Sequence, residues 1–152
     1  MFSLHALTSQ SSDIIFPFTP QQIAFNQKND KVLSETFLWL ESGLPENHHL
    51  YDIELKYLAE MLPLITVHNN ILFIQLQHDH KIDIIFENKY KILIPLSLRD
   101  EVIKSCHDHK LHGHFKEVTT FHRIASKFYW RTMRSDIATY IAKCIPCNLG
   151  SN

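Results

Sequence analysis

Apolar residues recur at helical spacing in the N-terminal and C-terminal parts of the chain, and in shorter runs between them. A helix is predicted to begin at Thr19-Pro20, because Thr is a favoured N-cap and Pro suits the first helical position. Its apolar face continues to Gly43. After a break at residues 44–47, residues 50–62 predict a second helix.

The middle of the chain predicts two β-hairpins. Each pairs two short apolar runs around a two-residue polar turn, and Asn is well suited to such turns. The runs are residues 64–68 and 71–76 around Asn69-Asn70, then 82–86 and 90–94 around Asn88-Lys89. Pro95 ends this small antiparallel sheet, and Ser97 is expected to cap a helix that leads into a histidine cluster.

The C-terminal segment has the clearest helical periodicity. Two stripes have apolar residues at i, i+3, i+4 and i+7, namely Phe121, Ile124, Ala125 and Phe128, then Ile137, Tyr140, Ile141 and Cys144. The second stripe is expected to place Cys144 on the buried face of a helix. We predict a core of Phe128, Trp130, Met133, Ile137, Tyr140 and Ile141, together with Phe115, Phe121 and Ile124.

Length and composition limit the class of protein. A chain of 152 residues fits one domain or two small ones. No apolar run approaches the roughly 20 residues that span a bilayer, and the N-terminus lacks a signal-peptide pattern, so we expect no membrane contact. Three cysteines, two of them close together, favour metal binding in a reducing compartment over disulfides. An intracellular location, nuclear or cytoplasmic, is therefore expected.

Charge is distributed unevenly along the chain. Residues 1–98 carry 6 Lys and Arg against 11 Asp and Glu, whereas residues 99–152 carry 9 against 5. A basic half of this kind can approach phosphate, although a solvated surface explains it equally well. The candidate DNA contacts lie off the apolar stripes and are Lys110, Lys116, Arg123, Lys127, Arg131 and Arg134.

Four residues form the strongest candidate site: His107, His114, Cys144 and Cys147. Two imidazoles and two thiolates fill the tetrahedral shell of a structural Zn²⁺. A redox dithiol is disfavoured, because reactive cysteines sit at helix N-termini and this pair is expected after a helix. A hydrolytic metal site is also disfavoured, because it needs an open position and carboxylates, and Asp108 is the only acid in the cluster.

These motifs, taken in order, resemble the zinc-binding N-terminal domain of integrases from Gypsy-class LTR retrotransposons and their retroviral relatives. The matching features run from Ile94 to Cys147 and are His107, Gly113-His114-Phe115, Thr120, Phe128-Tyr129-Trp130, Met133-Arg134, Asp136-Ile137 and Cys144-Ile145-Pro146-Cys147. Lys116 and Arg131 stand where the family usually has Gly and Pro. The family spacing selects His107 as the first ligand, with His109 as the alternative.

The resemblance implies an α+β chain in three parts. Residues 1–18 would be a tether, 19–95 an extension of helices and β-hairpins, and 96–152 a small helical domain stapled by Zn²⁺. Such a domain contacts DNA ends and other integrase subunits, commonly in a homo-oligomer. It does not itself catalyse joining, and no acidic two-metal site is evident before Asn152. The alternative is a domesticated integrase-derived module that binds protein or nucleic acid in a host protein.

Overall fold

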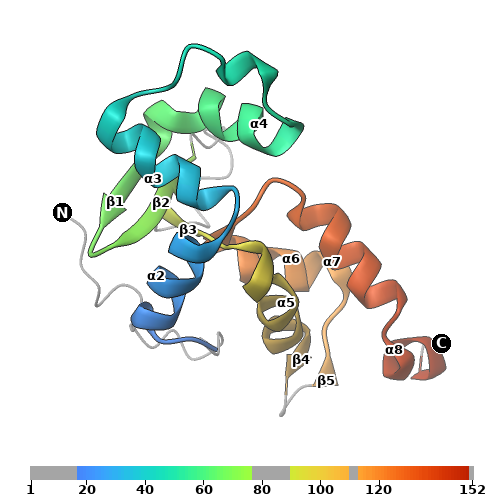
Figure 1. Cartoon of the computed structure of the whole chain (residues 1–152). Coiled ribbons are helices and arrows are strands. Elements are labelled where there is room, and N and C mark those ends of the chain that lie inside the picture. Colours follow the sequence, from blue (N-terminus) through green and yellow to red (C-terminus); the bar gives the residue numbers. More distant parts are fainter. Residues whose placement is uncertain (1–16, 77–89, 110–112, 151–152) are drawn as a thin grey trace.

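The computed structural model describes residues 17–76, 90–109 and 113–150. A four-stranded sheet lies beside a group of helices that leads to the C-terminus (Figure 1). Helices α3 and α4 lie at one side of this sheet, and α5, α6 and α7 lie at the other side. The predicted α+β class is confirmed. Within the described part of the chain, no helix is long and apolar enough to cross a membrane.

The sheet is mixed, with strand order β1-β2-β3-β6. Strands β1 (Ile65–His68) and β2 (Ile71–Gln75) form the predicted hairpin, and its turn residues Asn69 and Asn70 both have positive φ, as a tight hairpin turn requires. β3 (Tyr90–Leu93) pairs antiparallel with β2. The parallel partner β6 (Phe128–Tyr129) was not predicted. The predicted strand 82–86 and the turn Asn88-Lys89 lie outside the described residues.

Both faces of the central strands β2 and β3 are buried, and alternate residues of β2 point to opposite faces. Ile71 and Phe73 join a core with α2, α5, α6 and α7. Leu72 and Ile74 join a second core with α3 and α4. The central strand is therefore an almost continuous apolar run, because a strand covered on both faces has no polar side.

The predicted helix from Thr19 to Gly43 is in fact two helices. Thr19 caps α2 (Pro20–Asn29) with a capping box, as its Thr-Pro start indicated. The Asp30 carboxylate then accepts hydrogen bonds from the N–H groups of Val32 and Leu33, which start α3 (Leu33–Ser42). An Asp that competes for backbone donors interrupts a helix in this way. The predicted second helix is α4 (Ile53–Met61), capped by Asp52.

The C-terminal segment contains four helices, where the sequence predicted three, namely the helix after Ser97 and the two apolar stripes. They are α5 (Arg99–His107), α6 (Glu117–Ala125), α7 (Met133–Ala142) and α8 (Ile145–Gly150). Ser97 does not cap α5, because its hydroxyl donates to the side chain of Asn26. Phe128 lies in β6 and not at the end of a helical stripe. Cys144 lies between α7 and α8 and is only half-buried.

Packing continues across the predicted domain boundary at residue 95. β6 belongs to the C-terminal segment yet pairs with β3 of the extension. The N–H groups of Ile92 and Ile94 donate to the carbonyls of Lys127 and Tyr129 at 2.9 and 3.1 Å. The core that holds Ile124 and Ile137 also holds Ile23 from α2. The division into an extension and a zinc-binding domain at residue 95 stays a prediction. In the structure, the two parts share one sheet and one core.

Candidate metal centre

A short hairpin brings the two histidines of the candidate site together. Residue His107 ends α5, and the chain then pairs β4 (Asp108–His109) with β5 (Gly113–His114) in antiparallel register. Gly113 has a φ of +78°, which favours glycine because a Cβ atom would strain this conformation. The N–H of Phe115 donates to the carbonyl of His107 at 3.0 Å and continues the pairing. The six-residue spacing of the histidines is thus the length of this hairpin.

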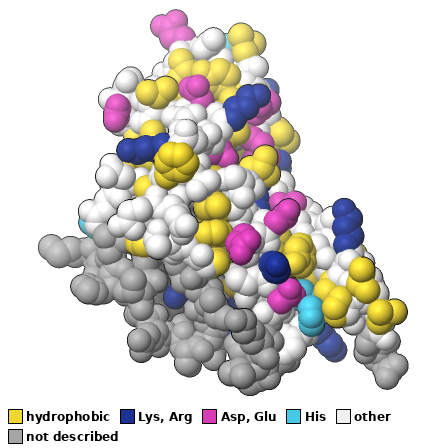
Figure 2. Space-filling model, turned by 60° about the horizontal axis from the view of Figure 1, so that its bottom comes forward, with side chains coloured by type: hydrophobic (Ala, Val, Ile, Leu, Met, Phe, Trp, Pro, Cys, Tyr) yellow, Lys and Arg dark blue, Asp and Glu magenta, His cyan; other side chains and the backbone are white. Residues whose placement is uncertain are grey.

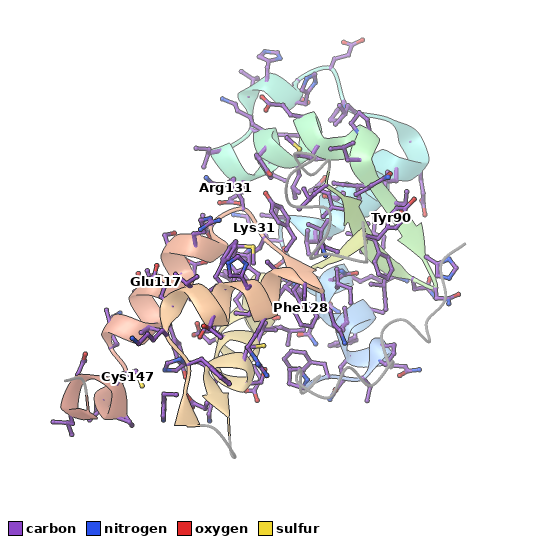
Figure 3. All side chains as sticks on the ribbon, turned by 180° about the vertical axis from the view of Figure 1, so that it is seen from behind. Lys31, Tyr90, Glu117, Phe128, Arg131 and Cys147 are labelled. Atoms are coloured by element: carbon purple, nitrogen blue, oxygen red, sulfur yellow. The ribbon has the colours of Figure 1, made fainter. Side chains whose placement is uncertain are left out.

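The two cysteines come from the junction of α7 and α8. Cys144 follows α7, and Cys147 lies in the first turn of α8. Figure 3 shows the Cys147 side chain on the side of α8 that faces the β4–β5 hairpin. Helix α7 itself is held over α5 and α6 by the buried Ile137 and Met133. Packing of the apolar stripe of α7 therefore positions the cysteines beside the histidines.

The four donor atoms converge. All lie within 4.8 Å of one another. His107 Nε2 lies 3.1 Å from His114 Nδ1 and 3.2 Å from Cys147 Sγ, and Cys144 Sγ lies 3.4 Å from His114 Nδ1. Zn–S and Zn–N bonds of about 2.3 and 2.0–2.1 Å place tetrahedral ligand atoms roughly 3.3–3.8 Å apart. The donor set and its spacing thus fit a single Zn²⁺.

The environment of His107 presents a lone pair on Nε2. Its side chain is fully buried, and its Nδ1 lies 3.5 Å from the hydroxyl of the buried Thr120, which in turn donates to the carbonyl of Phe115. A proton on Nδ1 leaves Nε2 unprotonated and aimed at the other donors. Burial also lowers the pKa of His107 below its ordinary value, against a smaller opposing effect of the Phe115 carbonyl. Both effects favour the neutral imidazole that binds metal.

The thiols do not have the character of a redox pair. Desolvation raises the pKa of Cys147, and its neighbour Cys144 raises it further. A reactive dithiol shows the opposite shift. The cysteines follow helix α7, as expected, and a further helix, α8, starts directly after Cys144. The interpretation is unaffected, since each sulfur lies 3.2–3.4 Å from an imidazole nitrogen, as metal ligands do.

Residues 94–152 match the family model described as the integrase zinc binding domain. The match begins directly after β3 and contains all four converging side chains. This segment is an integrase-type zinc-binding domain. The metal cofactor of such a domain is zinc, in agreement with the donor set found here. The domain thus comprises α5 to α8 together with the β4–β5 hairpin and β6.

The basic candidates of the integrase-type domain have different surroundings. Lys116 and Arg134 are exposed, while Arg123 and Lys127 are half-buried. The Arg123 guanidinium lies 4.4 Å from the centroid of the Phe115 ring, and the Arg134 guanidinium lies 3.9 Å from that of Phe121. Arg131 forms an ion pair with Glu54 of the extension. Lys110 lies outside the described residues, as does the side chain of His109.

Two residues near the metal centre had no predicted role. Thr120 was noted only as part of a motif, and its contact with His107 depends on the way α6 packs. Asp108 was noted only as the single acid in the cluster, yet its Oδ1 is buried beside both histidines. The pairing of Asp108 with His114 across a hairpin could have revealed this, because directly opposed residues point to the same face.

Proposed function

We propose that this chain is the N-terminal region of a retrotransposon-type integrase, and that His107, His114, Cys144 and Cys147 hold one structural Zn²⁺. The observation that carries the proposal is the convergence of these four donors within a segment that matches the integrase zinc-binding family. Four protein ligands close the shell, so the ion would stabilise the fold and would not activate water. The chain's own role is then binding and assembly, with no DNA cleavage or joining by this region alone.

Zinc binding can be tested directly on the purified protein. We expect one equivalent of zinc by elemental analysis, and loss of that zinc in Cys147→Ser. The matched control is Cys106→Ser, which removes the third cysteine, one buried in α5 and absent from the converging group. Zinc that survives in Cys147→Ser but is lost in Cys106→Ser would overturn the ligand assignment.

The first part of the proposed binding function is contact with DNA through the outer side of α6 and α7. Lys116, Arg123, Lys127 and Arg134 supply the positive charge. Arg123 stacks on the Phe115 ring and Arg134 stacks on the Phe121 ring. The N–H groups of a stacked guanidinium point outward in its own plane, where they can donate hydrogen bonds to phosphate oxygens. Arg131 is the weakest of the predicted contacts, because Glu54 already neutralises its charge. In Figure 3, helix α6 begins at the labelled Glu117 and runs toward the labelled Phe128.

The test is a titration of labelled duplex DNA at several salt concentrations. With three or four phosphate contacts, the logarithm of affinity should fall against the logarithm of salt with a slope of about −3. Lys116→Glu with Arg134→Glu should abolish most binding at low salt. Lys56→Glu, an equally exposed charge reversal on α4, should leave the slope within error of the unchanged protein. Equal loss in both variants would mean that net charge alone governs the interaction.

The second part is association with other integrase subunits through α8. Ile145 and Leu149 lie one helical turn apart and are 69% and 83% exposed. Figure 2 shows hydrophobic side chains gathered where this C-terminal part projects from the molecule. Since Cys147 would tie the same helix to the metal, a rigid apolar surface results, and such surfaces commonly form contacts between chains.

Self-association should therefore depend on α8. We expect Leu149→Lys to lower the average mass measured by analytical ultracentrifugation of the zinc-bound protein. Leu50→Lys changes a residue that is 72% exposed on the extension and serves as the matched control. A concentration-dependent mass that responds to Leu50→Lys and not to Leu149→Lys would place the contact on the extension.

A further inference from the structure

A crevice lies where the extension meets the integrase-type zinc-binding domain. The parallel strands β3 and β6 end side by side there and lead into different helices, α5 and α7. The two strand ends, together with α4 and the start of α3, enclose a cavity of about 320 Å³, a volume typical of small ligand sites. Lys31 and Arg131, labelled in Figure 3, line it from the two parts of the chain.

The walls of this crevice are mostly apolar, but the charge they leave uncompensated is positive. The apolar and aromatic wall residues include Leu33, Leu58, Leu93, Ile94, Tyr129 and Trp130. Both acids that line the crevice already have partners. Glu54 pairs with Arg131, and the Asp30 carboxylate accepts hydrogen bonds from three backbone N–H groups. Among the residues that the structure describes, neither Lys31 nor Arg99 lies within ion-pair distance of a carboxylate.

Arg99 is the half-buried member of this pair of cations. Its Nε donates one long hydrogen bond, 3.5 Å, to the carbonyl of Ile94, and its guanidinium lies 5.8 Å from the centroid of the Trp130 ring. Burial lowers the pKa of Arg99, and the more distant acids offset this only in part. A guanidinium held in this way can bind an incoming carboxylate through two parallel N–H groups.

A second hollow continues from the crevice on the other side of Arg99. It lies between α5 and α7, shares Leu96 and Arg99 with the crevice, and is also lined by Tyr140 and Lys143. Of its two acids, Asp136 accepts hydrogen bonds from Trp130 and Thr132, and Asp100 is exposed. Because the two hollows share wall residues, they form one groove with Arg99 between its halves. Such a shape suits an extended chain.

We propose that this groove binds a peptide segment of a partner protein in which an apolar residue stands next to an acidic one. The apolar side chain enters the crevice, where three aromatic rings line the walls, and the carboxylate pairs with Arg99. The inference goes beyond the zinc, DNA and α8 contacts proposed above and uses none of them. Since both parts of the chain supply the walls, the groove requires the extension and the zinc-binding domain to be packed together.

Nuclear magnetic resonance of the zinc-bound, unsubstituted chain tests the site without any variant. Of the two tryptophans, Trp130 lines the crevice, whereas Trp39 is buried in the core with α3 and α4 and lines neither hollow. Blocked pentapeptides with one Phe and one Glu, in both orders, should shift the indole N–H resonance of Trp130 and not that of Trp39. Equal shifts of both resonances, or no shift at millimolar peptide, would overturn the inference.

A double-mutant cycle tests the pairing with Arg99. Replacing Glu by Gln in the peptide should weaken binding about 10-fold or more, because a charge-assisted hydrogen bond is lost. Arg99→Gln should bind as weakly and no longer distinguish the two peptides. Lys104→Gln removes an exposed cation from the same helix and is the control, with unchanged affinity and preference. If Arg99→Gln does not fold, the unchanged protein decides alone, since equal binding of both peptides overturns the pairing.

Duplex DNA is the competing occupant, because cations also meet phosphate. A short duplex that shifts the Trp130 resonance while the peptides do not would overturn the inference and assign the groove to DNA. Failure of the peptides to bind a chain that holds stoichiometric zinc leaves the proposed function intact. Absence of zinc would instead overturn the proposed function.

Discussion

Nε of Arg131 donates a hydrogen bond of 3.0 Å to Oε1 of Glu54 and so joins the integrase-type zinc-binding domain to helix α4 of the extension. The hydroxyls of Tyr57 and Tyr129 form a second link between the same two parts. Both links lie beside the parallel pairing of β3 with β6. The extension is therefore attached to the zinc-binding domain by backbone and side-chain contacts together.

The ion pair between Glu54 and Arg131 should couple the stabilities of the two parts. We expect Glu54→Gln and Arg131→Gln each to lower the melting temperature, and the double variant to lower it by less than their sum. The coupling should shrink at high salt, because both side chains are about one third exposed. Thermal unfolding of the four proteins at low and high salt measures this. Strict additivity at low salt would show that the pair contributes nothing.

Metal removal should affect more than the metal-binding segment. Zinc binding in such sites contributes apparent free energies of about 10 kcal/mol or more to folding at neutral pH. The core beside the site also contains Ile23 and Ile71, from the extension. We therefore expect a chelator to lower helix content and to raise amide exchange in β3, which pairs with β6. Exchange that rises only after residue 95 would show that the extension folds independently.

Substitution of Ile137 tests the core that positions the two cysteines beside the histidines. Its side chain on α7 is fully buried, as the helical stripe predicted. Ile137→Ala should lower the free energy of unfolding by about 2–5 kcal/mol, because truncation leaves a cavity in a closed core. Val118→Ala, at a position 68% exposed on α6, should change it by less than about 0.5 kcal/mol. Denaturant titration of the zinc-bound proteins checks both values.

The periodicity and the motif spacing predicted most of the fold because they depend on local rules. The Asn69-Asn70 turn, the α2 start and the buried residues Phe128, Trp130, Met133 and Ile137 were confirmed. Tyr140, Ile141 and Phe121 are only partly buried, at the margin of that core. The convergence of the four donor residues was also predicted and confirmed. It could be predicted because the two histidines and the two cysteines each form a pair with a recognisable spacing in the sequence.

The failures have a common physical origin in contacts between distant segments. The parallel strand β6 is only two residues long, too short to leave a period-two pattern. The break between α2 and α3 depends on Asp30. Its Oδ2 also accepts a hydrogen bond from the N–H of Leu96, which is distant in the sequence. The buried oxygen of Asp108 depends on hairpin register. The pairing of β6 with β3 and the contact of Asp30 with Leu96 cannot be read from a local window of sequence.

Lys91 gives a prediction of pH dependence. This residue of β3 is almost fully buried, its ammonium group donates to the carbonyl of Ser126, and burial lowers its pKa from 10.5 to about 8. Between pH 8 and 10.5, the unfolded chain keeps this proton while the folded protein has lost it. Stability from this group therefore rises with pH across that window, and below pH 8 the cost of the buried charge is constant.

Comparison with Lys91→Met isolates this effect from the titration of the thiols. The free energy of unfolding of the unchanged protein, relative to Lys91→Met, should increase by about 1–3 kcal/mol between pH 8 and pH 10.5. Lys56→Met removes an exposed lysine and is the control, with a difference that stays flat over the same range. Urea unfolding at half-unit pH steps provides the measurement. A difference for Lys91→Met that is also flat would mean that this ammonium group titrates at its ordinary pKa, with water reaching it in the folded protein.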